Sequence, residues 1–221
     1  CGVAPLGCSD QPRRSASATA RLRFDNGIQA RLGYSRSIRR PEFADLNPAV
    51  PLSLSNNPFV QSGGSAGNPN LRQQESDSFD GTLEYYFRGG YVAVAGYHRK
   101  IRDRVINGAA NETYNGVDYS VTRPRNLGSA TLTGLEVSGQ YFLDFLPGAL
   151  SRLGVQGAFT LAHSEIGGND PLAGNPLQGV SEHNFNAGLL YERFGLSARA
   201  VYTYRSKYYD DDITGGNALR P

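Results

Sequence analysis

Residues 183–204 read HNFNAGLLYERFGLSARAVYTY, two alternating runs of polar and apolar residues on either side of a short turn. In the second run every other residue from Leu196 to Tyr204 is apolar or aromatic, and the residues between them are mostly polar. Successive side chains of a β-strand point to opposite faces, so this spacing places the apolar residues on one side. With Gly195 in the turn, the stretch predicts a β-hairpin with one apolar and one polar face.

The rest of the chain repeats this pattern three times, around turns at Asn26-Gly27, Gly89-Gly90 and Pro147-Gly148. We therefore expect eight strands, at about residues 16–24, 28–35, 77–87, 91–100, 130–142, 152–163, 183–192 and 196–205. Short turns alternate strictly with three long connections, at residues 36–75, 101–129 and 164–181. Within the second connection, residues 104–107 and 117–122 could extend the strands, whereas residues 205–221 predict a polar segment without a strand partner.

The composition is typical of an all-β protein whose sheet has one polar face and one apolar face. Hydrophobic residues make up 39% of the 221 residues, Gly and Tyr are frequent at 27 and 13, and the net charge is only +2. This charge predicts no nucleic-acid partner. No run of about 18 apolar residues occurs, which excludes a transmembrane helix but leaves a transmembrane β-barrel possible, because its strands are short and only half apolar.

The alternation of short turns and long connections favours an outer-membrane barrel. Such barrels have strands of about 9 to 11 residues, short periplasmic turns and long extracellular loops. A soluble lipocalin-like barrel would show the same alternation with its apolar face inside. The aromatic residues favour lipid, because one group (Phe24, Phe87, Tyr91, Tyr191, Phe194) gathers at the short turns and another (Tyr34, Tyr97, Phe159, Tyr202, Tyr204) at the long connections, as two interfacial girdles do.

This interpretation assigns faces to the residues of every predicted strand except 91–100, where apolar residues occur at both parities. Ten residues are predicted to face lipid: Leu22, Phe24, Leu32, Leu83, Phe87, Val137, Phe159, Leu189, Leu196 and Tyr202. Seven are predicted to face a water-filled lumen: Arg21, Arg31, Glu84, Glu136, Asn184, Asn186 and Arg199.

Several ordered motifs resemble the barrel of TonB-dependent outer-membrane receptors. They are YSRSIRRPEFADLNP (34–48), GNPNLR (67–72), LEYYF (83–87), LTGLE (132–136) and YTYRSKY (202–208), and the similarity spans residues 15–209. The resemblance implies about eight strands of an antiparallel, 22-stranded barrel in the bacterial outer membrane, with a plug domain and the TonB complex as partners. We expect an internal fragment from the C-terminal half of such a barrel, because neither plug nor TonB box is recognisable. The loop style resembles the carbohydrate-scavenging branch.

Ligand contacts are expected in the long connections. Arg40, Phe43, Asp45, Arg123 and Arg125 are candidates, because guanidinium groups bind carboxylates and phosphates. The alternative is that Arg40-Pro41 and Arg123-Pro124 brace the loops against the barrel wall. The predicted function is TonB-dependent uptake of a small-molecule nutrient, an oligosaccharide or a ferric siderophore.

Other chemistry has weaker support in the sequence. His98, His163 and His183 lack metal-ligand spacing, and Asp210-Asp211-Asp212 is typical of a solvated loop, so we expect neither a metal site nor a cofactor. Ser164 beside His163 has no surrounding nucleophile motif, so we expect no enzyme. Cys1 and Cys8 could form a small disulfide loop or be incidental thiols. A small eight-stranded binding or anchoring barrel and an outer-membrane hydrolase stay as alternatives.

Overall fold

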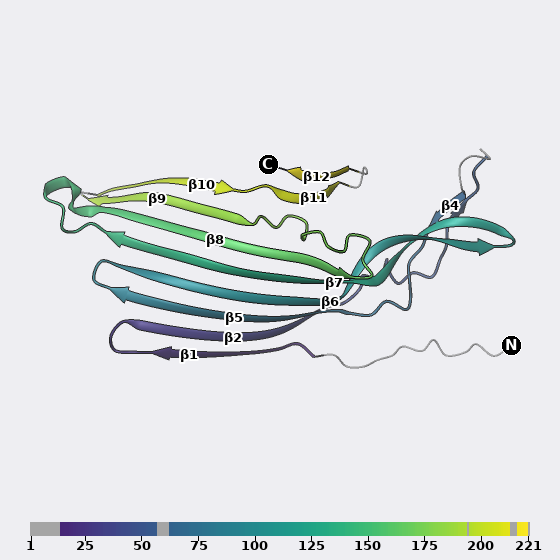
Figure 1. Cartoon of the computed structure of the whole chain (residues 1–221), viewed down its shortest axis with the longest axis horizontal. Helices are drawn as coiled ribbons and strands as arrows, with labels where there is room; N and C mark the ends of the chain where they lie inside the picture. The colour runs from purple at the N-terminus through teal and green to yellow at the C-terminus, as the bar shows by residue number, and fades with distance from the viewer. Residues whose placement is uncertain (1–13, 57–61, 194, 213–215, 221) are drawn as a thin grey trace.

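A computed structural model describes residues 14–56, 62–193, 195–212 and 216–220. Eight long strands form one antiparallel sheet in which neighbours along the chain pair in order, except that β2 pairs with β5 (Figure 1). They are β1 (Ala16–Arg23), β2 (Ile28–Arg39), β5 (Gln74–Phe87), β6 (Gly90–Tyr114), β7 (Val117–Phe142), β8 (Leu153–Gly168), β9 (His183–Arg193) and β10 (Leu196–Arg205). Among the described residues β1 and β10 do not pair, so the sheet is open.

The all-β, up-and-down architecture predicted from the sequence is confirmed, and each predicted strand has a counterpart. All short turns lie at one end of the sheet and the long connections lie at the other (Figure 1). One short 3-10 helix, η1 (Gly148–Arg152), sits in the turn between β7 and β8. Within the part of the chain that the structure describes, no helix is long and apolar enough to cross a membrane.

The predicted connection at residues 101–129 is mostly strand, and the expectation that residues 104–107 and 117–122 extend the strands is confirmed. β6 and β7 continue through it as a two-stranded ribbon that ends in the turn at Asn115-Gly116 and extends beyond the rest of the sheet (Figure 1). The pairing shifts register between Ile101 and Arg104, where Asp103 has a positive φ of 52°. Such an irregularity bends the strand and increases its twist, which accounts for the change in direction of the ribbon.

Two predictions of irregular chain were wrong. Residues 36–75 contain the end of β2, the start of β5, and the short strands β3 (Leu52–Ser53) and β4 (Ser62–Ser65), of which β4 pairs in parallel with β7. Beyond residue 204, β11 (Tyr208–Asp212) pairs with β12 (Gly216–Arg220), so this segment does have a strand partner. These strands were missed because they are too short to show a period of two.

Strand register determines which residues share a face, because directly paired residues in an antiparallel sheet point to the same side. One row joins Leu83, Val94, Val137, Phe159 and Phe185 across five strands. A row on the opposite face joins Arg21, Arg31, Thr82, Ala95, Glu136, Thr160 and Asn184. Followed along the strands, the register places nine residues of the first predicted set on the apolar face and the seven of the second on the polar face. Phe24 follows the last residue of β1 and lies outside the pairing.

The two predicted aromatic groups are partly wrong. Tyr91 pairs with Gln140, and Tyr97 pairs with Asp80 and Gly134, so both tyrosines lie on the polar face. The sequence could not assign them because apolar residues occur at both parities within residues 91–100. Phe194 lies outside the described residues.

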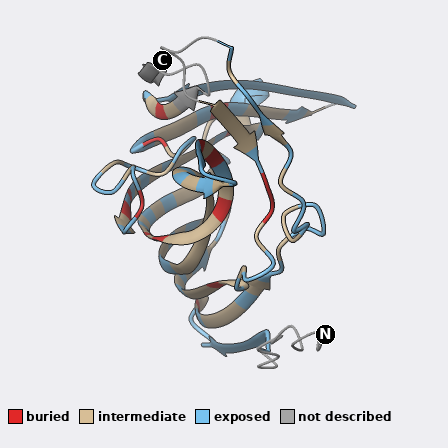
Figure 2. Cartoon of the chain, turned by 90° about the vertical axis from the view of Figure 1, so that its right-hand side faces the viewer, coloured by how far each residue is buried: buried red, intermediate tan, exposed pale blue. Residues whose placement is uncertain are grey.

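Burial is concentrated at the end of the long connections (Figure 2). Ala66, Tyr119 and Val121 form a small apolar cluster where the segment between β2 and β5 packs on the β6–β7 ribbon. The apolar face of the sheet, in contrast, has no covering layer, and Leu32 and Leu189 expose 67% and 52% of their surface.

Candidate functional site

Between β2 and β5, residues 40–56 and 62–73 form a folded cover on the β6–β7 ribbon. The backbone N–H of Ala66 donates to the carbonyl of Thr122 at 3.0 Å, and that of Asn68 donates to the carbonyl of Asp45 at 2.6 Å. The side chain of Asn68 donates to the carbonyl of Pro124 at 3.1 Å. The motif residues 34–48 and 67–72 are therefore held together and against the ribbon.

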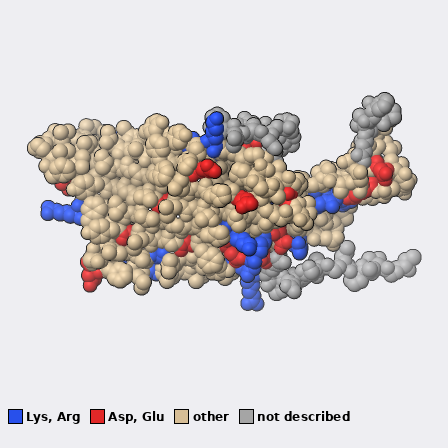
Figure 3. Space-filling model, viewed as in Figure 1, with Lys and Arg blue, Asp and Glu red and all other residues tan. Residues whose placement is uncertain are grey.

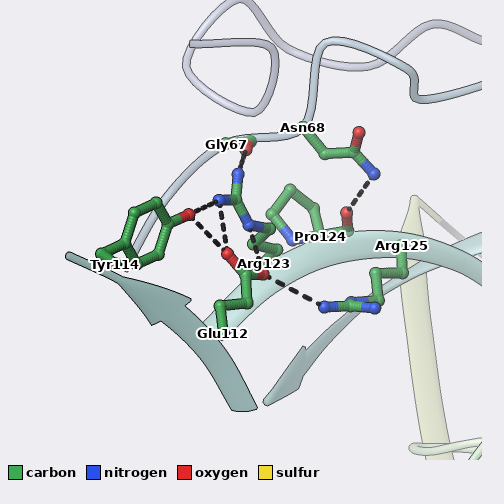
Figure 4. Close-up of polar contacts among 7 residues, drawn as sticks. All are labelled: Gly67, Asn68, Glu112, Tyr114, Arg123, Pro124 and Arg125. Carbon is green, nitrogen blue, oxygen red and sulfur yellow. Dashed lines mark hydrogen bonds and ion pairs between the residues drawn. The ribbon is translucent and has the colours of Figure 1, made fainter. Parts of the chain in front are cut away.

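Arg123 is the centre of the polar contacts between ribbon and cover (Figure 4). Its Nε donates to Oε1 of Glu112 at 2.8 Å and its Nη2 to Oε2 of Glu112 at 2.7 Å, a two-pronged ion pair across the ribbon. Its Nη1 donates to the carbonyl of Gly67 at 2.8 Å, and its Nη2 also donates to the hydroxyl of Tyr114 at 2.8 Å. We call Arg123, Glu112, Tyr114 and Gly67 the clasp.

Within the clasp, Arg123 and Glu112 form a close ion pair that shifts the pKa of both side chains. Hydrogen bonds from Arg123 and Tyr114 lower the pKa of Glu112 from its usual 4.5 to about 2. The same hydrogen bond with Glu112 raises the pKa of Arg123. Arg125 approaches Glu112 less closely, at 3.5 Å from Nη2 to Oε1. The side-chain donors of Arg123 are thus directed to groups within the protein. These contacts agree with the alternative that Arg123 braces a loop and does not bind a ligand.

Gly67 fits the clasp because it has no side chain. A Cβ at this position would lie 2.5 Å from the carbonyl oxygen of Asn47 and 2.7 Å from that of Asp45. Both neighbours are backbone atoms, so a larger residue would force the cover apart. The glycine of the GNPNLR motif thus allows its backbone to lie directly against the backbone of Asp45 and Asn47.

Two adjoining cavities lie between the cover and the ribbon. The smaller, of about 150 Å³, is lined by Arg39, Arg40, Glu42 and Gln74 among others. The larger, of about 630 Å³, is lined by Asn47, Ser65 and Thr122 among others. They share three lining residues, Asp45, Asn107 and Pro124. Together they form a hollow with basic, acidic and amide groups around it, which we call the mouth hollow.

The structure separates the five predicted ligand residues into three groups. Arg40 and Asp45 line the mouth hollow. Phe43 is 94% exposed and is not among the residues that line either cavity. Arg123 and Arg125 belong to the contacts around Glu112.

Sequence reasoning missed the contacts that hold the base of the ribbon. The amide of Asn126 donates to the carbonyls of Arg72 and Asp103 at 3.0 and 2.9 Å, and Arg72 forms an ion pair with Asp103 at 2.8 Å. Arg104 forms an ion pair with Asp170, which is nearly buried. The only signal in the sequence was the loss of alternation after residue 101, where the irregular pairing occurs.

The remaining candidate residues that the structure describes do not form a reactive group. Ser164 and His163 are neighbours in β8, so their side chains point to opposite faces, and the Ser164 hydroxyl accepts a hydrogen bond from the backbone of Leu177. Within the described ranges, no three His, Cys, Asp or Glu residues are grouped as metal ligands would be. Asp210 accepts a hydrogen bond from Gln178. Cys1 and Cys8 lie outside the described residues.

Residues 10–220 match the family model described as TonB dependent receptor-like, beta-barrel. The chain belongs to the TonB-dependent receptor family. The family predicted from the ordered motifs is therefore confirmed. The comparison with curated proteins found no match.

Three solved structures of receptors and a transporter have a similar fold. The siderophore receptor PirA from Acinetobacter baumannii has a TM-score of 0.68 and 15% identity, over 93% of this chain and 30% of the receptor. The ferric enterobactin receptor PfeA from Pseudomonas aeruginosa, a variant in complex with enterobactin, has a TM-score of 0.68 and 20% identity, over 93% and 31%. The copper transporter OprC has a TM-score of 0.60 and 15% identity, over 92% and 28%. The chain spans about 30% of the length of these receptors.

Proposed function

We propose that this chain is part of the barrel wall of a bacterial outer-membrane receptor that imports a small-molecule nutrient. The mouth hollow carries this proposal, because it lies at the long-connection end of the sheet and is lined by Arg40, Asp45 and Asn107. The family and the open, curved sheet support the same function. The sheet geometry does not favour a closed eight-stranded barrel, since no pairing joins β1 to β10 among the described residues.

The proposal includes an orientation in the membrane. The apolar face meets outer-membrane lipid, the polar face lines the lumen, and the short turns are periplasmic. A plug domain and the TonB complex are the expected partners of the complete receptor. With this orientation, the cover and ribbon stand at the extracellular entrance, where they meet cargo first.

The hollow favours a cargo rich in oxygen atoms. Arg39 and Arg40 offer charged donors, whereas Glu42, Asp45 and the amides of Asn47 and Asn107 offer acceptors. Ferric siderophores and oligosaccharides both present such groups. Two of the similar structures are siderophore receptors, which supports the siderophore as the first cargo to test.

Binding and uptake by the complete receptor test this proposal. Arg40→Ala should weaken binding of the cargo by about tenfold, because a charge-assisted hydrogen bond contributes about 1.5 kcal/mol or more. Arg88→Ala is the matched control, since it removes the same charge from the exposed turn between β5 and β6 at the other end of the sheet. Labelled ferric siderophores and oligosaccharides are supplied to cells with equal surface levels of each receptor.

Uptake should also stop when the proton-motive force is dissipated, because the TonB complex draws on it. The proposal is refuted if no member of either cargo class is taken up by the unaltered receptor. Equal binding by the Arg40→Ala and Arg88→Ala receptors would exclude the mouth hollow as the cargo site while leaving uptake itself intact.

A further inference from the structure

Strand β6 has an outer edge without a partner strand where it leaves the body of the sheet. β5 pairs with β6 only as far as Glu75 and Arg102. Beyond that point β6 continues through the ribbon, and among the described residues only β7 pairs with it there (Figure 1). β7 is covered on its other side, because β4 pairs with residues 119–122. One edge of the ribbon is therefore protected and the other is open.

The hydrogen bonds of the cover show which backbone groups of β6 point to this edge. The carbonyls of Thr122 and Pro124 accept hydrogen bonds from the cover, so both point away from β6. Opposite residues of an antiparallel pair alternate between those that exchange hydrogen bonds and those that do not. Ala109 and Asn107 lie opposite Thr122 and Pro124, so they direct their N–H and C=O groups to the outer edge. Pro124 fits this arrangement because it has no N–H to donate to β6.

The backbone groups at this edge are accessible. Asn107 and Ala109 are exposed, and neither forms a backbone hydrogen bond there with another residue that the structure describes. They present two N–H donors and two C=O acceptors along one line. Residues 104–114 contain no Lys or Pro, the residue types that commonly protect an exposed edge from pairing. We call Asn107, Gly108 and Ala109 the open edge.

The mouth hollow lies beside the open edge. Asn107 and its partner Pro124 line both of its cavities, and Arg40 and Glu42 line the smaller one. Directly paired residues share a face, so a residue of an added strand opposite Asn107 would direct its side chain into the hollow. Charged side chains of both signs gather where the long connections meet the body of the sheet, whereas much of the same view is uncharged (Figure 3). The hollow thus suits a polar or charged side chain.

We propose that the cargo is bound through an extended peptide segment, which pairs with the open edge as an added antiparallel strand and places one side chain in the mouth hollow. This inference rests on the proposed function, because it names the cargo class of the same hollow. In antiparallel pairing, three residues suffice to form all four hydrogen bonds with the open edge. Added strands gain affinity from such main-chain bonds and specificity from side-chain pockets. Ferric siderophores with a peptide backbone meet this requirement, whereas oligosaccharides have no alternating N–H and C=O groups.

Peptide binding by the complete receptor tests this inference. A library of acetylated pentapeptide amides is screened against the purified receptor, and the peptide that binds most tightly becomes the probe. Each backbone N–H of the probe is then replaced by N-methyl, one position at a time. Successive residues of a strand direct their N–H groups to opposite sides, so methylation should weaken binding about tenfold at every second position. The positions between should bind nearly as well as the parent peptide.

Ala109→Pro is the matching change in the receptor. It removes one N–H from the open edge and keeps the hydrogen bonds between β6 and β7, because proline is tolerated where its nitrogen faces solvent. Binding of the probe should weaken about tenfold, which corresponds to about 1.4 kcal/mol. Ala109→Val is the control, since it keeps the N–H and should bind the probe as the unaltered receptor does. Heat-modifiable mobility and the hydrogen exchange of Ala66 show whether barrel and cover are intact in each variant.

Three results would overturn the inference. The first is a library from which no peptide binds, the second is N-methylation that shows no period of two, and the third is equal binding of the probe by the Ala109→Pro and unaltered receptors. Cargo uptake is measured with the same receptors. Uptake of a labelled oligosaccharide without peptide binding would refute this inference and leave the proposed function intact. Binding of the probe with the expected period, but without uptake of any cargo, would contradict only the proposed function.

Discussion

Replacing Arg123 by Ala should open the cover without loosening the sheet. The substitution removes four hydrogen bonds, two to Glu112 and one each to Gly67 and Tyr114. Hydrogen bonds to charged groups contribute about 1.5 to 3 kcal/mol each, and their contributions within one group do not add fully. The side chains of Arg123 and Glu112 are 18% and 23% exposed, and Tyr114 still donates to Glu112 after the substitution. We therefore expect the free energy of opening the cover to fall by about 2 to 3 kcal/mol.

Hydrogen exchange measures this opening directly. The amides of Ala66 and Asn68 join the cover to Thr122 and to Asp45, so their exchange reports on the contacts made by the cover. A loss of 2 to 3 kcal/mol corresponds to exchange about 30 to 150 times faster. Amides in the β5–β6 pairing between residues 79 and 98 should keep their rates, because none of the lost contacts reaches them.

Arg125→Ala is the control for this prediction. Arg125 also carries a positive charge near Glu112, but at 3.5 Å it makes only one weak contact. We expect less than about a fivefold change in the exchange of Ala66 and Asn68. Unchanged exchange in the Arg123→Ala receptor would refute the clasp, and equal acceleration in the β5–β6 pairing would show that Arg123 supports the whole sheet instead.

Two further predictions concern the pH dependence of the clasp and the faces of the sheet. The pKa of Glu112 is lowered to about 2, so its stabilisation is complete above its usual value of 4.5 and is lost as the pH falls towards 2. Exchange of Asn68, corrected for the intrinsic rate, should accelerate over that range in the unaltered receptor but not in a Glu112→Gln receptor. Leu189→Arg places a charge on the apolar face and should cost about 2 to 4 kcal/mol, with loss of heat-modifiable folding. Asn186→Arg, on the polar face, should fold normally, and equal folding of both variants would contradict the assignment of lipid to the apolar face.

The sequence predicted the body of the sheet because period two is explicit there. Apolar residues alternate through β1, β2, β9 and β10, and Asn26-Gly27 supplies the positive φ that a tight hairpin needs. The same alternation predicted which residues of these strands share the apolar face and which share the polar face. They could not be assigned for β6, where residues 91–95 are apolar at both parities, and the pairing partners of Tyr91 and Tyr97 were needed to place them on the polar face.

The candidate site was only partly predictable. Arg40 and Asp45 were selected as candidates by residue type, and they line the mouth hollow. Glu112, however, lies in a stretch without alternation, and its contact with Arg123 depends on the pairing of residues 104–114 with 117–128. The contact between Gly67 and Arg123 joins residues 56 positions apart, and it depends on the parallel pairing of β4 with β7. Pairing between residues far apart in the sequence cannot be predicted from the local alternation of polar and apolar residues.

The tip of the β6–β7 ribbon has a practical consequence for engineering. Asn115 and Gly116 both have positive φ, as a two-residue hairpin turn requires, and a Cβ on Gly116 would have no atom within 4 Å. The contacts of the clasp begin at Tyr114 and run back towards the sheet. A peptide tag inserted between Asn115 and Gly116 would therefore project away from the protein without entering its packing. In the orientation proposed above, this turn is the position from which a displayed epitope would be presented outside the cell while the entrance below it keeps its shape.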